Sequence, residues 1–269
     1  MGAALQVGPF VLPGALLVLA AAAAVTGFTG KRLGGASGGH VETVIWQTLL
    51  VGLLVARLAF VWQFRSAYWA APLEVLDIRD GGWSAEAGFA GGWLYAISQT
   101  ARKPALKRPL LWALAAGSVL WLAGSVALAV LPGKGQPLPE IELATAQGTR
   151  VSLSDFVGKP TVVNIWATWC PPCVREMPVL QQAQIDHPSI NFVFLNQRES
   201  AERVNAWMAA RQLTLRNVLL DDKAQAAAAF KQTALPTTLF FNANGELVST
   251  RIGELSKASL TERLESLAP

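Results

Sequence analysis

The sequence predicts an α-helical membrane region of about four spans, followed by an α/β domain with a mixed central sheet and helices on both faces. Three observations support this fold class. The 269 residues are 52% hydrophobic and 15% charged, whereas a soluble domain carries about 25% charged residues. Most basic residues of the first half flank apolar runs, as expected of membrane topology. The second half alternates strand and helix patterns.

Charge is distributed unevenly along the chain. Residues 1–135 contain ten Lys and Arg and five Asp and Glu, a net charge of +5, and residues 136–269 contain twelve and thirteen, a net charge of −1. A nucleic-acid-binding domain would need basic residues gathered on one face of a folded unit, and the sequence pattern indicates no such face. The composition therefore argues against nucleic acid as a partner and favours the lipid bilayer.

Four apolar segments are candidate membrane spans, and the first is long enough to cross a hydrocarbon core of about 30 Å. The third is the weakest, because it contains Glu86 and three glycines. A cleaved signal peptide is the alternative for the first segment, but a signal needs basic residues before its apolar stretch, and here Lys31 follows it. The expected spans are Leu5–Phe28, Val41–Phe64, Trp83–Ala101 and Leu110–Leu131.

The short loops predict the orientation of these spans, because cytoplasmic loops carry an excess of Lys and Arg. The first and third loops hold the basic clusters, so both are expected inside, and with four spans both termini lie outside. We expect a multi-pass protein of the bacterial inner membrane with its C-terminal domain in the periplasm. The basic clusters are Lys31, Arg32, Arg102, Lys103, Lys107 and Arg108.

Domain boundaries follow from composition. Residues 1–131 form the membrane region, the turn-rich residues 132–139 form a linker, and residues 140–269 form one α/β domain. Within this domain Asn244-Gly245 predicts a β-hairpin, and Ser200 is a candidate helix N-cap. Strands are expected at Val151–Leu153, Thr161–Trp166, Ile190–Leu195, Val218–Leu220, Thr237–Asn242 and Leu247–Ile252, and helices at Cys173–Asp186, Ala201–Gln212, Lys223–Phe230 and Ser259–Leu267.

The chain has two cysteines, Cys170 and Cys173, directly after an expected strand and at the start of an expected helix. A zinc site would need two more ligands, and covalent haem attachment would need a histidine where Val174 stands. A structural disulfide between residues so close in sequence would constrain little of the unfolded chain. The spacing therefore predicts a redox-active dithiol, with no metal and no other cofactor.

This placement suits thiol–disulfide exchange, in which a thiolate is the attacking group. Because a helix N-terminus lowers the pKa of a cysteine, Cys170 is expected to be the exposed nucleophile. Cys173, one turn further in, is the expected shielded, resolving thiol. Pro171 and Pro172 carry no N–H group, so the Cys170 thiolate has few backbone donors. This favours a reductant over a strong oxidant, although one charged neighbour can reverse the preference.

The dithiol lies in the run Val163-Asn164-Ile165-Trp166-Ala167-Thr168-Trp169-Cys170-Pro171-Pro172-Cys173-Val174-Arg175-Glu176-Met177-Pro178, and Leu235-Pro236-Thr237-Thr238 follows later in the chain. The two stretches resemble the active-site stretch and the cis-proline segment of TlpA/ResA-like thioredoxin-fold thiol–disulfide oxidoreductases. The resemblance covers roughly Pro137–Pro269. It implies a thioredoxin fold in which Pro236 lies opposite the dithiol and the neighbouring backbone pairs with a substrate strand.

The resemblance also implies the remaining site residues. The buried Asp of thioredoxin corresponds to Asn164, which cannot act as a base. The Glu that follows the central strand in the TlpA/ResA-like branch corresponds to Glu199, a candidate proton carrier for the resolving thiol. The alternative is that Glu199 is a solvated residue ahead of a helix. The implied catalytic residues are Cys170, Cys173, Glu199 and Pro236, and the implied substrate contacts are Trp169, Pro171, Pro172, Leu235 and Thr237.

The membrane region carries Gly52-Leu53-Leu54-Val55-Ala56-Arg57-Leu58, Pro72-Leu73-Glu74 and Gly81-Gly82-Trp83-Ser84-Ala85-Glu86-Ala87-Gly88. Over roughly residues 5–105 these stretches resemble the first part of prolipoprotein diacylglyceryl transferase. Arg57 matches that family, but the family's histidine falls on Glu86 and its later Arg/Asn/Glu signature is missing. The resemblance implies a truncated, inactive relative that anchors the redox domain.

The favoured function is a membrane-tethered, extracytoplasmic reductase of disulfides in periplasmic client proteins. Three alternatives are lipid transfer by the membrane half, a thiol oxidase acting in the opposite direction, and a binding or chaperone module whose dithiol is incidental. Residues 1–135 contain no cysteine, so the membrane half cannot pass electrons by thiol exchange. We therefore expect a separate membrane electron donor of the DsbD or CcdA type.

Overall fold

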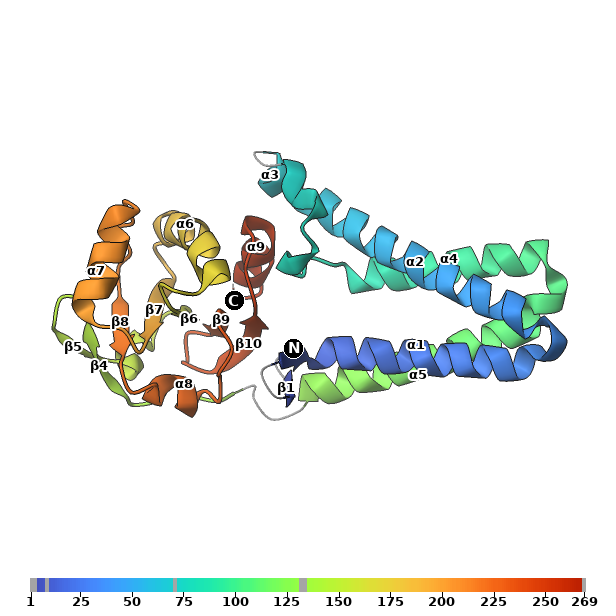
Figure 1. The fold of residues 1–269 in the computed structure, drawn as a ribbon, viewed down its shortest axis with the longest axis horizontal. Helices are drawn as coiled ribbons and strands as arrows, with labels where there is room; N and C mark the ends of the chain where they lie inside the picture. Colours follow the sequence, from blue (N-terminus) through green and yellow to red (C-terminus); the bar gives the residue numbers. More distant parts are fainter. Residues whose placement is uncertain (1–3, 8–9, 70–71, 131–134, 268–269) are drawn as a thin grey trace. The chain divides into compact units, whose positions relative to one another are not determined.

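The computed structural model describes residues 4–7, 10–69, 72–130 and 135–267. The chain divides after Val130 into two compact units, which are described separately. The N-terminal unit is mainly helical and the C-terminal unit is built on a β-sheet (Figure 1). The expected linker 132–139 lies partly outside the described residues, which resume at Gly135.

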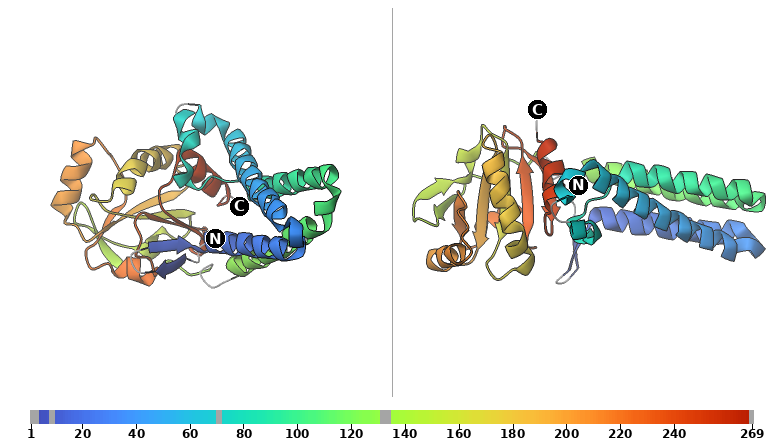
Figure 2. Two further views of the ribbon diagram at one scale, coloured as in Figure 1. Left: turned by 45° about the vertical axis from the view of Figure 1, so that its right-hand side comes forward. Right: turned by 90° about the horizontal axis from the view of Figure 1, so that it is seen from above.

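The long helices of the N-terminal unit pack as two antiparallel pairs, α1 with α5 and α2 with α4 (Figures 1 and 2). Short helical turns connect them. The elements are β1 (Ala4–Val7), β2 (Phe10–Pro13), α1 (Gly14–Gly34), η1 (Gly35–Ser37), α2 (Gly38–Gln63), α3 (Arg65–Tyr68), η2 (Pro72–Leu76), η3 (Ile78–Asp80), α4 (Ala85–Arg102), η4 (Pro104–Leu106) and α5 (Lys107–Val130).

The first long helix begins later than the sequence predicts. Strands β1 and β2 pair antiparallel ahead of it, and α1 starts at Gly14. A proline lacks an N–H group and disfavours helical geometry in the residue before it, so Pro13 marks the boundary. The expected span Leu5–Phe28 is therefore wrong at its start, and the apolar helix is Gly14–Gly34.

Three of the described helices are long and apolar enough to cross a membrane: α1, α2 and the segment Pro104–Leu128. The expected third span, Trp83–Ala101, coincides with α4 but does not meet that standard of length and hydropathy. Helix α4 instead packs closely on α2. A Cβ atom placed on Gly88 would lie 2.9 Å from the carbonyl oxygen of Gly52, the close approach that small residues allow between membrane helices.

The C-terminal unit contains a mixed seven-stranded sheet, as counted in the described residues, in the order β10-β9-β6-β7-β8-β4-β5. Strands β6, β7 and β8 run parallel, and the remaining neighbours pair antiparallel. The elements are β4 (Glu142–Thr145), β5 (Arg150–Ser152), η5 (Leu153–Phe156), β6 (Thr161–Trp166), α6 (Pro171–Asp186), β7 (Asn191–Gln197), α7 (Ala201–Ala210), β8 (Val218–Asp221), α8 (Gln225–Ala229), β9 (Thr237–Phe241), β10 (Leu247–Ile252) and α9 (Lys257–Glu265).

Each face of this sheet has its own apolar core, because side chains alternate along a strand. Helices α6, α7 and α9 cover one face, which Phe192 and Phe194 of β7 contact (Figure 1). Helix α8 and η5 cover the other, which Val193 and Leu195 contact. The mixed sheet with helices on both faces agrees with the fold that the sequence predicts.

Candidate active site

The dithiol lies where strand β6 ends and helix α6 begins. Cys170 is the N-cap residue of α6, and its Sγ accepts a hydrogen bond of 3.3 Å from the backbone N–H of Cys173. Prolines occupy the first two helical positions, where a missing N–H is tolerated best. The two sulfur atoms form a disulfide, with the Cα atoms 5.3 Å apart. The strand–turn–helix context predicted from sequence is therefore present.

The exposure expected of Cys170 is not found in this disulfide form. Cys170 is 4% exposed and Cys173 is fully buried, and both belong to the apolar core on the α6 side of the sheet. Both cysteines are therefore buried in this form, and the assignment of Cys170 as the nucleophile stays a prediction. The neighbouring Trp169 is 62% exposed and provides an apolar surface next to the sulfur pair.

Sheet register brings the proline segment to the edge of the sheet that holds the dithiol. The Leu235–Pro236 peptide bond is cis, as the family resemblance implies. Strand β9 begins at the next residue and pairs antiparallel with β6, so that Thr237 lies opposite Ile165. The start of β9 thus meets the end of β6, from which the chain continues into the Cys170 loop.

The residues predicted to contact substrate differ in exposure. Trp169 and Pro171 are exposed, Pro172 and Leu235 are half-buried, and Thr237 is completely buried. The hydroxyl of Thr237 donates to the carbonyl of Ala234. Four of the five therefore have side-chain surface exposed to solvent.

A buried carboxylate, Glu176, lies one helical turn beyond Cys173 and was not singled out from the sequence. It is 1% exposed, and its two oxygens accept hydrogen bonds from the Asn164 side chain, at 2.8 Å, and from the Leu255 backbone N–H, at 2.9 Å. Burial raises the pKa of Glu176 to about 7, against these hydrogen bonds, which lower it. A carboxyl with such a pKa can hold or release a proton at neutral pH.

Asn164 links this carboxylate to the proline strand. Its amide nitrogen donates both to Glu176 and to the hydroxyl of Thr238, at 3.0 Å. Its Oδ1 atom is buried without a hydrogen-bond partner. The strand β6 partner of this pair is therefore an amide, and the acid lies on helix α6. The signal in the sequence is the i, i+3 spacing of Cys173 and Glu176, which places both on one face of a helix.

Glu199 lies between β7 and α7 and is 8% exposed. Its carboxylate accepts hydrogen bonds from the backbone N–H of Thr168, at 2.7 Å, from the Thr168 hydroxyl, and from the Asn196 amide, and it forms an ion pair with Arg203 at 2.9 Å. It is therefore not a solvated residue. It holds the loop that leads to Cys170.

No cluster of three or more His, Cys, Asp or Glu side chains that could hold a metal ion occurs in the described part of the chain. The groups that the fold brings together at this edge of the sheet are a sulfur pair, a buried acid with a neutral-range pKa, and an exposed indole. This set supports thiol chemistry coupled to proton transfer.

Comparison with known proteins agrees with this geometry. Residues 134–250 match the AhpC/TSA family. Thiol-disulfide oxidoreductase ResA of Bacillus subtilis is 30% identical over 148 residues, which cover 52% of this chain and 82% of ResA. Thioredoxin-like protein YneN of the same organism is 29% identical over 136 residues, covering 49% of this chain and 79% of YneN. Among solved structures, StoA from Bacillus subtilis is 27% identical with a TM-score of 0.42, covering 48% of this chain and 99% of StoA.

The family match lies in the C-terminal half, which contains the dithiol. Enzymes of this kind exchange disulfides through a cysteine pair and need no cofactor. With its Cys170–Cys173 disulfide at the start of α6, the C-terminal half of this chain belongs to the ResA-type, thioredoxin-like thiol–disulfide oxidoreductases.

Proposed function

We propose that this chain is a membrane-anchored enzyme that reduces disulfides of client proteins in the periplasm. Residues 1–131 would be the membrane region, residues 132–139 the linker and residues 140–269 the redox domain. The observation that carries the proposal is the shielded Cys173 with the buried acid Glu176 one turn away. That pair can resolve a mixed disulfide, because the resolving thiol has a proton acceptor within the protein.

The reaction begins with the reduced dithiol. The Cys170 thiolate attacks one sulfur of the client disulfide, forms a mixed disulfide and releases the first client sulfur as a thiolate. Cys173 then loses its proton to Glu176 and attacks Cys170. The second client sulfur leaves, and the Cys170–Cys173 bond forms. The client thiolates take up two protons from solvent, to which Glu176 returns the proton of Cys173. The client thus gains two electrons and two protons, and the enzyme is left oxidised.

The reducing direction is supported by the prolines at the start of α6. Pro171 and Pro172 remove two N–H groups that would otherwise stabilise a Cys170 thiolate, and the Cys173 N–H is the backbone donor that reaches its sulfur. A less stabilised thiolate makes the reduced form a better electron donor. An oxidase acting in the opposite direction would need additional thiolate stabilisation.

The proposed topology has four crossings, α1, α2, α4 and α5, with both termini outside. Both basic connections, α1 to α2 and α4 to α5, lie at the same end of the helical unit, which supports an even number of crossings (Figure 1). We expect alkaline phosphatase fused after Gly135 to be active, because this enzyme matures only outside the cytoplasm. Fluorescence from a cytoplasmic reporter fused at Gly135 would contradict the topology.

We further propose that the membrane region is a shortened relative of diacylglyceryl transferase that anchors but does not transfer lipid. Glu86 stands in place of the family's histidine. The guanidinium of Arg57 directs its hydrogen bonds to protein groups, including the Asp80 carboxylate and the Gly82 carbonyl. Little donor capacity remains for a lipid headgroup.

The proposed function requires a separate electron donor, because residues 1–135 contain no cysteine. We propose a membrane reductase of the DsbD or CcdA type. In growing cells the Cys170–Cys173 pair should be mostly reduced, and deletion of every such donor should leave it oxidised. Alkylation of acid-trapped cells measures the two forms. A pair that stays reduced without these donors would contradict the reductase direction, and a pair oxidised in the parent strain would indicate an oxidase.

The proton-carrier role of Glu199 stays a prediction, and Glu199→Gln tests it. Its hydrogen bonds to Thr168 favour a positioning role, so we expect attack and resolution to slow together, by about threefold to tenfold. Stopped-flow tryptophan fluorescence separates the two steps. A proton carrier would instead show slower resolution with an unchanged first attack.

A further inference from the structure

The segment between α2 and α4 exposes large apolar side chains. Trp69, Leu73, Leu76 and Ile78 are 88%, 82%, 78% and 62% exposed. Leu73 and Leu76 lie in η2, where three residues make one turn, so both project to the same side. These four residues are called the apolar ridge below. Large apolar side chains that are exposed together on one segment indicate a surface that another apolar phase covers.

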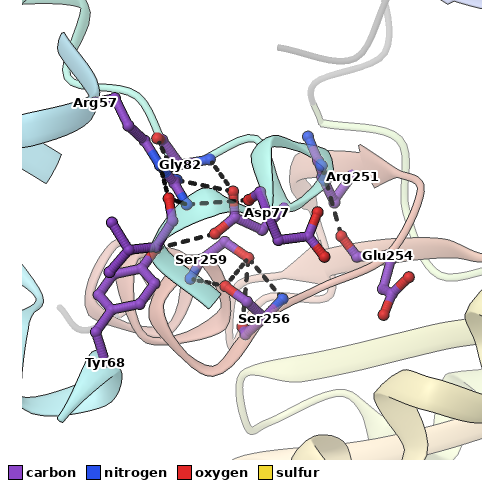
Figure 3. A network of polar contacts seen from close by, with 10 residues as sticks. Arg57, Tyr68, Asp77, Gly82, Arg251, Glu254, Ser256 and Ser259 are labelled. Atoms are coloured by element: carbon purple, nitrogen blue, oxygen red, sulfur yellow. Dashed lines mark hydrogen bonds and ion pairs between the residues drawn. The ribbon is translucent and has the colours of Figure 1, made fainter. Parts of the chain in front are cut away.

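Behind the ridge the chain wraps around one buried guanidinium. Arg57 of α2 is 7% exposed. Its Nε donates a hydrogen bond to the Val75 carbonyl at 3.1 Å. Its Nη1 donates to the Asp80 carboxylate at 3.0 Å and to the Gly82 carbonyl at 2.8 Å. Its Nη2 donates to the Val75 and Asp77 carbonyls at 3.0 Å each (Figure 3). These bonds use all five N–H groups of an arginine.

The Asp80 carboxylate completes the cluster. It accepts hydrogen bonds from the Tyr68 hydroxyl, at 2.9 Å, and from the Gly82 backbone N–H, at 3.0 Å. Gly82 packs against the ring of Phe60 with no room for a Cβ atom. The Asp80 carboxylate and the carbonyls of Val75, Asp77 and Gly82 are therefore turned toward Arg57, whereas the four side chains of the ridge are exposed.

The lipid bilayer is the occupant that fits the ridge. On α2, Leu54, Leu58 and Trp62 are 63%, 63% and 71% exposed and recur every four residues, so they form one apolar stripe that leads up to the segment. Arg65 lies over the Trp62 ring, 5.4 Å from its centre. Aromatic side chains with a neighbouring basic group are typical of the membrane–water interface.

We propose that the apolar ridge is an interfacial anchor, which lies in the outer leaflet at the headgroup boundary and is held in shape by the Arg57–Asp80 cluster. The proposal rests on the membrane insertion proposed above. It fixes the depth of the outer ends of α2 and α4, on the side of the membrane where the redox domain works.

The test uses single cysteines carrying the fluorophore NBD in the Cys170→Ser, Cys173→Ser background, which removes both native cysteines. The test position is Leu76→Cys. Gln147→Cys, in an exposed turn of the redox domain, is the aqueous control, and Val119→Cys, in the middle of α5 and 66% exposed, is the deep-lipid control. The chain is reconstituted in vesicles of phosphatidylethanolamine and phosphatidylglycerol.

We expect the Leu76→Cys label to be quenched by lipids that carry a spin label near the headgroup, and to be at least threefold less sensitive to aqueous iodide than the Gln147→Cys label. The Val119→Cys label should respond best to a spin label deep in the acyl chain. The anchor proposal would be overturned if iodide quenched the Leu76→Cys label as strongly as the Gln147→Cys label. It would also be overturned if neither iodide nor the headgroup spin label quenched the Leu76→Cys label. If the Val119→Cys label also fails to respond to lipid, membrane insertion itself is wrong.

Discussion

Replacing Cys173 by serine is expected to leave the enzyme covalently attached to its client. Cys170 can still attack a client disulfide, but the buried thiol that would release the mixed disulfide is gone. Turnover in an insulin-reduction assay should fall by at least 10³-fold, a loss typical of removing a group essential to covalent catalysis. Non-reducing gels should show higher-mass species that disappear with dithiothreitol. Mass spectrometry of these species identifies the clients.

The matched control is Cys170→Ser. It should also abolish turnover, but it should form no mixed disulfides, because the outer thiol is missing and Cys173 is fully buried. If Cys170→Ser forms adducts as readily as Cys173→Ser, the assignment of nucleophile and resolving thiol is reversed. A pH titration of alkylation on the reduced protein should likewise show Cys170 reacting first, with a pKa below about 8.5.

Replacing Glu176 by glutamine is expected to slow the second exchange step by about 10²-fold at pH 7, a typical contribution of a general base. The first attack by Cys170 should change little. In the parent protein the rate of the second step should rise as pH increases through about 7, where Glu176 ionises. The variant should lose this inflection. Rapid-mixing kinetics over pH 5–9 measures both steps.

Glu176→Gln is also expected to change stability, and at pH 8 it should stabilise the protein although it slows the second exchange step. Burial raises the pKa of Glu176 from 4.5 to about 7 in the folded protein. The folded state therefore binds more protons than the unfolded state in this interval, and the free energy of unfolding falls as pH rises from about 4.5 to about 7. The loss is on the order of 3 kcal/mol. Glu176→Gln should remove this dependence and be the more stable form at pH 8.

Glu202→Gln is the matched control, because Glu202 is an exposed carboxylate in the first turn of α7. Urea unfolding of residues 135–269 at pH 5 and pH 8 compares the variants. Equal pH dependence in the parent protein and in Glu176→Gln would mean that Glu176 is not the group that titrates. If Glu176→Gln leaves the rate of the second exchange step unchanged, Glu176 has a purely structural role.

The dithiol could be predicted from the sequence because its determinants are local. A strand, a turn and a helix that begins with two prolines all lie between Thr161 and Asp186. The proposed role of Glu176 could not be predicted in this way. It depends on which face of α6 is buried and on a hydrogen bond from the backbone N–H of Leu255, 79 residues further along the chain. Strand β4 was missed because its four residues carry little pattern of their own.

The N-terminal half was harder to predict because hydropathy does not distinguish one apolar structure from another. The run from Leu5 reads as one helix, yet Pro13 separates a strand hairpin from α1. Helix α4 has the expected position, but its glycines serve close packing on α2 at the expense of hydropathy. Arg57 was singled out only as a residue that matches the transferase family, and the carbonyls that surround it come from a loop without a motif.

The hydrogen bond of 2.8 Å between Asn164 and Glu176 also bears on how such enzymes can diverge. Asn164 belongs to strand β6 and Glu176 to helix α6. The carboxyl and the amide can therefore exchange places while the hydrogen bond between the two positions is kept. An Asn164→Asp, Glu176→Gln double variant would retain one acid, one amide and the same net charge in the core. Through such a double substitution, related enzymes could differ in whether the strand or the helix carries the buried carboxyl group, with both cysteines unchanged in position.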